Sequence, residues 1–176
     1  MSIKDPAKQL EITFKTIFID RMQDMPIINH NIEVKAVGFT PWQQYHFGAL
    51  ITPWFMNLIL IPQQENQLNG NVGKIKKIQL PSGYYDFILN FEQGIGYYLS
   101  CSLFSPMFIF ENQSAAELTA IESLIAILDA KDLDGSTKTP ATTQNDNTEA
   151  SKSISTINAS RRNFIRGKIL PKASKR

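Results

Sequence analysis

The residues between 32 and 104 constrain the fold most, because apolar and polar side chains alternate there with a period of two. Near the start of this region, Ile32, Val34 and Ala36 alternate with Glu33 and Lys35. A period of two places alternate side chains on opposite faces of an extended strand. The same pattern returns in Tyr85, Phe87, Leu89 and Phe91. These segments are therefore expected to be β-strands with one buried face.

Further strands are expected at residues 47–51, 55–61, 75–80 and 96–104. The connections between strands are short and rich in residues that favour turns, at residues 41–45, 69–71, 81–83 and 93–94. Such connections are typical of hairpins, whereas parallel strands need long crossovers. The sequence therefore predicts an antiparallel meander.

A helix is predicted before the first strand. Asp5 and Pro6 suit its N-cap and its first position, and Pro26 is expected to end it. Apolar residues recur between these positions at helical spacing, namely Leu10, Phe14, Ile17, Phe18, Met22 and Met25.

A second helix is predicted after the last strand. Ser114 and Glu117 have the spacing of a capping box, in which each side chain binds the backbone N–H of the other residue. The pair Asp134-Gly135 suits the end of this helix. One apolar stripe follows the predicted cap, made of Leu118, Ile121, Ile125 and Leu128. The expected fold class is α+β, an antiparallel meander sheet flanked by an N-terminal and a C-terminal helix.

Charge divides the 176 residues into an acidic body and a basic tail. Residues 1–134 carry 9 Lys or Arg and 14 Asp or Glu, whereas residues 135–176 carry 9 and 2. Residues 135–157 include 10 Ser or Thr and few apolar side chains, too few to offset the entropy of ordering them. We therefore expect a globular domain at 1–134, a flexible Ser/Thr-rich tether at 135–159 and a disordered basic tail at 160–176.

Few residues suit catalysis or metal binding. The chain has one cysteine, Cys101, and two histidines, His30 and His46. This composition excludes an intramolecular disulfide and a CxxC site and disfavours a multi-histidine metal centre, with a lone histidine and carboxylates as the remaining alternative. No nucleophile elbow, zinc-protease helix or phosphate-binding loop occurs, and residues 94–96 lack the third glycine of a dinucleotide site. We expect a binding protein rather than an enzyme, with no cofactor.

The sequence also bears on location. The longest apolar stretch, residues 49–61, is interrupted by polar residues and proline and is shorter than the about 20 residues of a membrane-spanning helix. Acidic residues occupy the N-terminal region where a secretory leader has a basic start. We therefore expect a cytoplasmic protein without a membrane span.

The first candidate binding segment contains three large apolar residues in succession, Trp54, Phe55 and Met56. In an extended strand, successive side chains point to opposite faces, so at least one of them leaves a one-sided core. Exposed aromatic and methionine side chains are typical of peptide-binding grooves. The alternative is a strand that is covered on both faces.

The second candidate segment is residues 100–108, where serines and a proline interrupt the strand pattern. It either lines a cleft or turns the chain toward the second helix. Cys101 lies within an apolar strand pattern and is expected to be an inert hydrophobe rather than a nucleophile. The candidate client-binding residues of this segment are Cys101, Ser102, Phe104, Ser105 and Met107.

The tail contains a sequence motif of its own. Residues 160–166, Ser-Arg-Arg-Asn-Phe-Ile-Arg, match the twin-arginine consensus S-R-R-x-F-[LI]-[KR] of bacterial export signals. The motif lies near the end of the chain with no hydrophobic stretch of signal length after it, so it cannot act as an ordinary leader. The alternative is a solvated basic tail that carries the pattern by chance. The residues of interest are Arg161, Arg162, Phe164 and Arg166.

Several segments resemble the family of [NiFe]-hydrogenase assembly chaperones. The most specific are Thr-Pro-Trp at 52–54 and Ser-Cys-Ser-Leu at 100–103. The full set of matching segments is 21–26, 37–39, 52–58, 80–83, 95–107 and 161–167. The tether is longer and richer in Ser and Thr than the family leads us to expect, so the reach of the tail motif is open.

The resemblance implies a non-enzymatic cytoplasmic chaperone in hydrogenase maturation. Its implied partner is the precursor of the hydrogenase small subunit with its twin-arginine signal peptide, and further partners are the large subunit and other maturation proteins. An acidic body suits the basic start of such a leader. One alternative is an assembly scaffold that carries iron or a cofactor precursor through Cys101 or a histidine. A nucleic-acid binder is disfavoured because the acidic body would repel phosphate.

The twin-arginine-like tail suggests a form of regulation. Arg161, Arg162 and Phe164 are expected to compete with a client leader as a tethered ligand, on the same chain or on a neighbouring copy. A flexible tether gives an effective concentration of roughly millimolar, so a weak intrinsic affinity suffices. The alternative is that the tail binds another maturation factor.

Overall fold

The computed structural model describes residues 5–64 and 67–129. All of them belong to the acidic body. The tether at 135–159 and the tail at 160–176 lie outside the described residues, so these expectations stay predictions.

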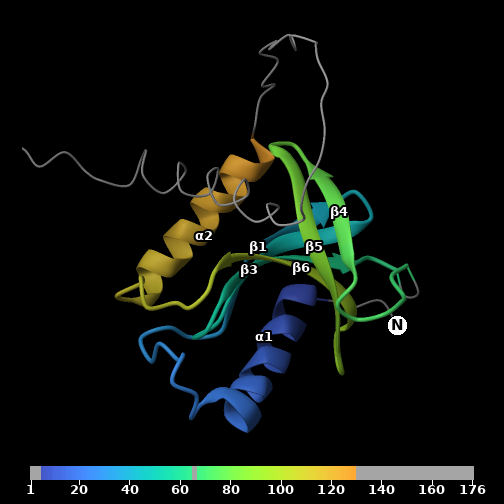
Figure 1. Ribbon diagram of the computed structural model, residues 1–176. Coiled ribbons are helices and arrows are strands. Elements are labelled where there is room, and N and C mark those ends of the chain that lie inside the picture. Colours follow the sequence, from blue (N-terminus) through green and yellow to red (C-terminus); the bar gives the residue numbers. More distant parts are fainter. Residues whose placement is uncertain (1–4, 65–66, 130–176) are drawn as a thin grey trace, which may run out of the picture. The chain divides into compact units, whose positions relative to one another are not determined.

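A single six-stranded antiparallel sheet forms the centre of the described body (Figure 1). Its strands are β1 (Lys35–Trp42), β2 (Tyr45–Ile51), β3 (Met56–Pro62), β4 (Ile75–Leu80), β5 (Gly83–Glu92) and β6 (Gly96–Phe104). Every neighbouring pair is antiparallel. Together with the two α-helices, this arrangement confirms the expected α+β class.

The strand order departs from one continuous meander. The order across the sheet is β1-β2-β3-β6-β5-β4, so β3 pairs with β6 and β4 lies at an edge. Each half is a meander, and the long connection between β3 and β4 allows the crossing. Burial explains the order: Leu99 and Cys101 of β6 are buried, whereas Lys76 and Lys77 lie on β4. Lysines suit an edge strand, where they discourage further pairing.

The expected strand at residues 32–36 is mostly wrong. Strand β1 begins at Lys35, and the two preceding apolar residues are buried in different cores, Ile32 in one and Val34 in the other. Loop contacts hold their backbone, because Ile32 N–H donates to Asn29 O and Glu33 N–H donates to Gln113 Oε1. The alternation therefore reflects two-sided burial rather than a strand with one buried face.

Helix α1 (Pro6–Ile17) begins as predicted. The Asp5 side chain accepts a hydrogen bond from Lys8 N–H at 3.0 Å, and Pro6 occupies the first turn. The helix continues into a wider π-helical turn, η1 (Phe18–Met22), which ends before Pro26. Leu10 and Phe14 are buried, whereas Met25 is exposed. The predicted stripe is thus correct in its first turns and too long at its end.

Helix α2 (Gln113–Leu128) has a different cap from the one predicted. The side chain of Asn112, not of Ser114, accepts the backbone N–H of Ala115 at 3.0 Å. Asn112 is an equally suitable cap residue, and the loop geometry before the helix selects it. The helix ends at Leu128, before the Asp134-Gly135 pair.

Two hydrophobic cores lie on opposite faces of the sheet. Alternate residues of β3 separate them, since Leu58 and Leu60 belong to the core under α2 and Ile59 and Ile61 to the core under α1. Figure 1 shows the two helices on the two sides of the sheet. The central strands are therefore buried on both faces, which explains why their sequences are almost continuously apolar.

Candidate functional site, an apolar stripe on helix α2

The predicted apolar stripe of α2 faces outward rather than toward the sheet. The exposed fractions are 58% for Leu118, 44% for Ile121, 56% for Ile125 and 36% for Leu128. The helix instead packs through a row of mostly small residues, namely Ala116, Ala120, Ser123, Leu124 and Ile127. Small side chains let the helix approach the sheet closely. The periodicity therefore located the helix correctly but selected the wrong face as the core.

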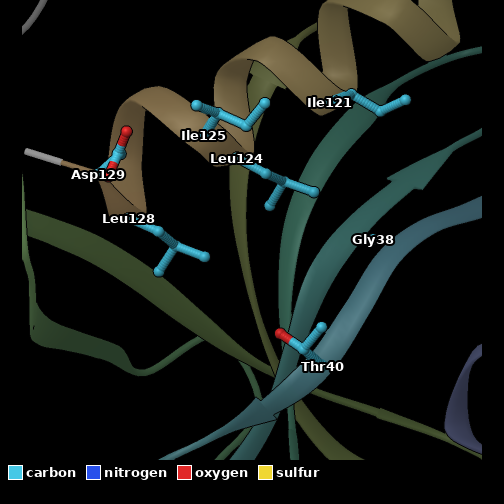
Figure 2. Close-up of a pocket in the computed structure, with 7 residues that line it drawn as sticks. All are labelled: Gly38, Thr40, Ile121, Leu124, Ile125, Leu128 and Asp129. Carbon is cyan, nitrogen blue, oxygen red and sulfur yellow. The ribbon is translucent and has the colours of Figure 1, made fainter.

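A pocket adjoins this stripe where α2 crosses strand β1 (Figure 2). Its volume is about 420 Å³. Figure 2 shows Leu124 and Leu128 pointing down from the helix toward the strand that carries Gly38 and Thr40. The lining residues are Gly38, Thr40, Ile121, Leu124, Ile125, Leu128 and Asp129. The pocket is thus mainly apolar, with a carboxylate at the end nearest the helix C-terminus.

A bulge in β1 forms the floor of the pocket. The register with β2 shifts between Val37 and Thr40, and Gly38 has a φ of +66°. Glycine adopts this left-handed conformation without the steric cost of a β-carbon. A β-carbon at Gly48 would meet the ring of Phe39 at 2.5 Å, so this ring lies directly on the neighbouring strand. Gly38 therefore gives the pocket floor its shape, and Phe39 packs against the neighbouring strand at Gly48.

Acidic groups flank the stripe. Helix α2 contains Glu117 and Glu122, its C-cap is Asp129, and it contains no lysine or arginine. Unpaired carbonyls at a helix C-terminus carry partial negative charge, which adds to the charge of Asp129. Among the described residues, Glu122 and Asp129 form no ion pair. The apolar surface is therefore bordered by negative charge.

Glu117 is held by two partners. Gln113 Nε2 donates to Glu117 Oε1 at 2.9 Å, and Lys35 Nζ lies 3.3 Å from the same oxygen. The hydrogen bond from Gln113 and, to a lesser extent, Lys35 hold the pKa of the Glu117 carboxyl below its usual range. Glu117 therefore stays charged and links α2 to the start of β1.

The predicted aromatic segment is packed rather than exposed. Trp54 is buried on the α1 side, where its ring stacks on Phe18 at 6.1 Å between centroids, and Met56 is buried on the α2 side. Phe55 is half-buried and contacts Phe14 edge to face at 5.8 Å. Thr52 Oγ1 accepts the N–H of Phe55 at 2.9 Å and fixes the turn. Trp54 and Phe55 therefore lie in the turn before β3, and Met56 begins that strand. The segment is covered on both faces of the sheet, as in the alternative, but only its last residue is in a strand.

The segment at residues 100–108 is also largely packed. Cys101 and Met107 are buried, Phe104 is half-buried, and Ser102 and Ser105 are exposed. The buried Asn29 side chain holds this turn by donating from Nδ2 to Met107 O at 3.0 Å and to Phe110 O at 2.8 Å. The geometry matches the alternative in which the segment turns the chain toward α2. Its role in client binding stays a prediction.

Among the residues that the structure describes, the two histidines form no second site. His30 is exposed and His46 is half-buried, on different elements. Within residues 5–64 and 67–129, no group of three or more His, Cys, Asp or Glu is placed to hold a metal ion. In the same part of the chain, no helix has the length and apolar character needed to cross a membrane. Arg161, Arg162, Phe164 and Arg166 lie beyond the described residues.

Sequence reasoning missed the pocket itself. Leu118, Ile121, Ile125 and Leu128 were recognised as a stripe, but Gly38 and Thr40 were not linked to them. The available signal was the glycine in the middle of segment 37–39, since an isolated glycine in a strand marks a bulge or a close approach.

Comparisons with known proteins agree with this fold. The family model described as "[NiFe]-hydrogenase assembly, chaperone, HybE" matches residues 5–167. The hydrogenase expression/formation protein HupJ of Bradyrhizobium diazoefficiens is 36% identical over 148 residues, 83% of this chain and 78% of that protein. The solution structure of HybE from Escherichia coli has a TM-score of 0.60 at 23% identity and covers 85% of this chain and 91% of that chain. At this identity, the last likeness establishes the fold alone.

One relative is considerably longer than the matched region. The protein named "Probable rubredoxin HupJ" from Rhodobacter capsulatus is 34% identical over 119 residues, which are 67% of this chain but only 43% of that protein. The family model, in contrast, spans most of the present chain. The chain therefore belongs to the HybE family of [NiFe]-hydrogenase assembly chaperones.

Proposed function

We propose that this protein is a non-enzymatic, cytoplasmic chaperone that binds the precursor of a [NiFe]-hydrogenase small subunit through its twin-arginine signal peptide. Binding precedes cofactor insertion and export, and the large subunit and other maturation proteins are further partners. Membership of the family supports the hydrogenase context. The twin-arginine leader is the ligand that the family resemblance implies, and the surface of this chain suits a basic peptide with an apolar part.

The observation that carries the proposal is the apolar stripe of α2 with its acidic border. Four large aliphatic side chains are exposed in one row, and such contiguous patches are typical of protein interaction sites. Glu122 and Asp129 add negative charge beside them. Charge favours encounter with a basic leader, and burial of its apolar part favours a long residence time.

Purification from native cells tests the function. The tagged full-length protein is isolated without crosslinking, and every bound polypeptide is identified by its mass. A small-subunit precursor that still carries its leader is the expected partner. Recovery of mature hydrogenase alone, or of no hydrogenase subunit from cells that synthesise the precursor, would contradict the proposal.

A further inference from the structure

We propose that the apolar stripe of α2 and the adjoining pocket are the docking site for a basic amphipathic helix formed by the client leader. The inference rests on the proposed function for the identity of the client, and it assigns the surface and the conformation of the ligand. Four observations support this occupant over a strand or a second copy of the chain.

The spacing of the stripe is that of a helix-packing surface. The intervals from Leu118 to Ile121, to Ile125 and to Leu128 are three, four and three residues. This is the a and d pattern of a heptad, which presents a narrow apolar row to one facing helix. The sheet does not use this row, because α2 contacts it through the opposite face. A partner helix can therefore pack along the stripe without disturbing the fold.

The charges beside the stripe disfavour a second copy of α2. In the same heptad, Glu117 and Glu122 occupy the flanking g and e positions. Parallel pairing of two copies would place Glu117 opposite Glu122, and antiparallel pairing would place each beside its own equivalent. Lys35 partly offsets the charge of Glu117, so Glu122, which has no ion pair among the described residues, contributes most of the repulsion between copies. A partner with lysine or arginine at the flanking positions would instead be attracted.

Edge strand β1 is poorly suited to accept an added strand. The Ala36 N–H already donates to Glu11 Oε1 at 3.0 Å, and Pro41 has no N–H to offer. The bulge at Gly38 further interrupts the row of backbone groups. These are devices that block edge pairing. An extended leader would therefore find few continuous backbone partners on β1, and the other edge strand, β4, carries Lys76 and Lys77, which repel a basic leader. A helical ligand on α2 is thus favoured.

The pocket and the helix end suit the twin-arginine motif. An arginine and a phenylalanine three residues apart, as in S-R-R-x-F, lie on the same face of a helix. With the phenylalanine ring in the pocket beside Ile125 and Leu128, the arginine can approach Asp129 and the negative end of α2. The two features therefore orient the leader along the stripe.

The docking site is tested by a binding assay with the full-length protein in which Arg161→Gln and Arg162→Gln disable the chain's own twin-arginine-like tail, so that the tail does not compete with the probe. This double variant is the reference form of the assay. The probe is a fluorescent synthetic peptide with the sequence of residues 158–172, which contains the twin-arginine pattern. Ile125→Asp is expected to weaken binding at least about ten-fold, because it places a charge in the middle of the apolar contact. The matched control is Ile109→Asp, since Ile109 is 63% exposed and lies in the loop before α2. The Ile109→Asp control is expected to bind the probe with the affinity of the reference form.

Charge reversal supplies a second arm. Glu122→Lys is expected to weaken probe binding about three-fold at low salt, with the difference shrinking as salt rises. Asp86→Lys makes the same charge change at an exposed position of β5 and is expected to have little effect. Thermal unfolding of each variant establishes that it is folded. In the bound peptide, NMR is expected to show helical Cα shifts.

The possible outcomes distinguish failure of the proposed docking site from failure of the proposed function. The site assignment is overturned if the reference form does not bind the probe, if Ile125→Asp in that form binds equally well, or if the bound peptide is extended. It is also overturned if the stripe mediates a dimer that Ile125→Asp dissociates. Co-purification of the precursor with the Ile125→Asp variant at wild-type yield would leave the chaperone function intact and reject this surface. Loss of the precursor from the wild-type preparation would reject the function.

Discussion

Gly38 and Leu124 lie so close that a β-carbon added to Gly38 would stand 2.6 Å from Leu124 Cδ1. This contact brings α2 onto the bulge of β1 and forms one wall of the pocket. The positive φ of Gly38 and the missing side chain are both required, the first for the bulge and the second for the approach of the helix.

Replacement of Gly38 by alanine tests this relationship. Gly38→Ala is expected to destabilise the protein by about 1 to 3 kcal/mol, because it strains the backbone and displaces Leu124. Gly73→Ala is the control, since Gly73 also has a positive φ but a β-carbon there meets nothing within 4 Å. Urea unfolding measures both variants. An equal loss for the two would show that the contact with Leu124 adds nothing.

The cap of α2 gives a second prediction. Asn112→Ala is expected to lower the free energy of unfolding by about 1 kcal/mol, because it removes the acceptor for the Ala115 N–H. Ser114→Ala is expected to change it by less than about 0.5 kcal/mol, since Ser114 is exposed and is not the cap. Thermal or urea unfolding distinguishes the two. A larger loss of stability for Ser114→Ala than for Asn112→Ala would show that Ser114 caps the helix, as the predicted capping box requires.

Glu117 makes stability depend on pH at the acidic end. Its pKa is lower in the folded protein than in the unfolded chain, first through the hydrogen bond from Gln113 and then through Lys35. The stabilisation from Glu117 is therefore fully present above the ordinary pKa of a carboxyl group, and it is lost as the pH falls through the lower pKa of Glu117 in the folded protein. Glu117→Gln is expected to flatten this part of the stability curve.

An NMR titration of the Glu117 carboxyl checks the order of the two causes. Gln113→Ala is expected to raise its pKa more than Lys35→Met, because the Gln113 hydrogen bond is the larger cause. The reverse order would show that the charge of Lys35 dominates.

The twin-arginine-like tail leads to a prediction about affinity. Deletion of residues 160–176 is expected to strengthen binding of a client leader peptide, because the tail is proposed to compete for the same ligand site. Arg161→Gln combined with Arg162→Gln tests the motif without shortening the chain. Isothermal calorimetry measures the leader affinity of each form. Unchanged or weaker binding after deletion would eliminate the competitor, and selective loss of another maturation factor would favour the alternative.

Local sequence signals succeeded where neighbouring residues determine the outcome. The expected strands at residues 75–80 and 96–104 have the bounds of β4 and β6, and Asp5 caps α1 as predicted. Caps, turns and period-two patterns act over a few residues, so the sequence displays them directly. The same signals were insufficient for the α2 cap, where Asn112 and Ser114 are both acceptable residues two positions apart.

Long-range packing explains why the sequence-based predictions of exposed side chains and of strand order were wrong. At least one of Trp54, Phe55 and Met56 was expected to leave a one-sided core, but Trp54 and Met56 are buried under different helices and Phe55 is half-buried. The number of covered faces of a strand depends on where both helices pack, which no local pattern records. Likewise, pairing of β3 with β6 brings together segments that the chain separates by two other strands.

Local patterns and motifs were sufficient to predict the α+β class, most of the helices and strands, the acidic body and the family to which the chain belongs. Tertiary structure decided which face of α2 is buried, because Ala116 and Ala120 allow closer packing on the sheet than the bulky row beside them. It also placed Gly38 beneath that helix and thereby formed the pocket. A helix with two apolar faces has no local reason to prefer either, and only the shape of the sheet below it selects the one that remains exposed.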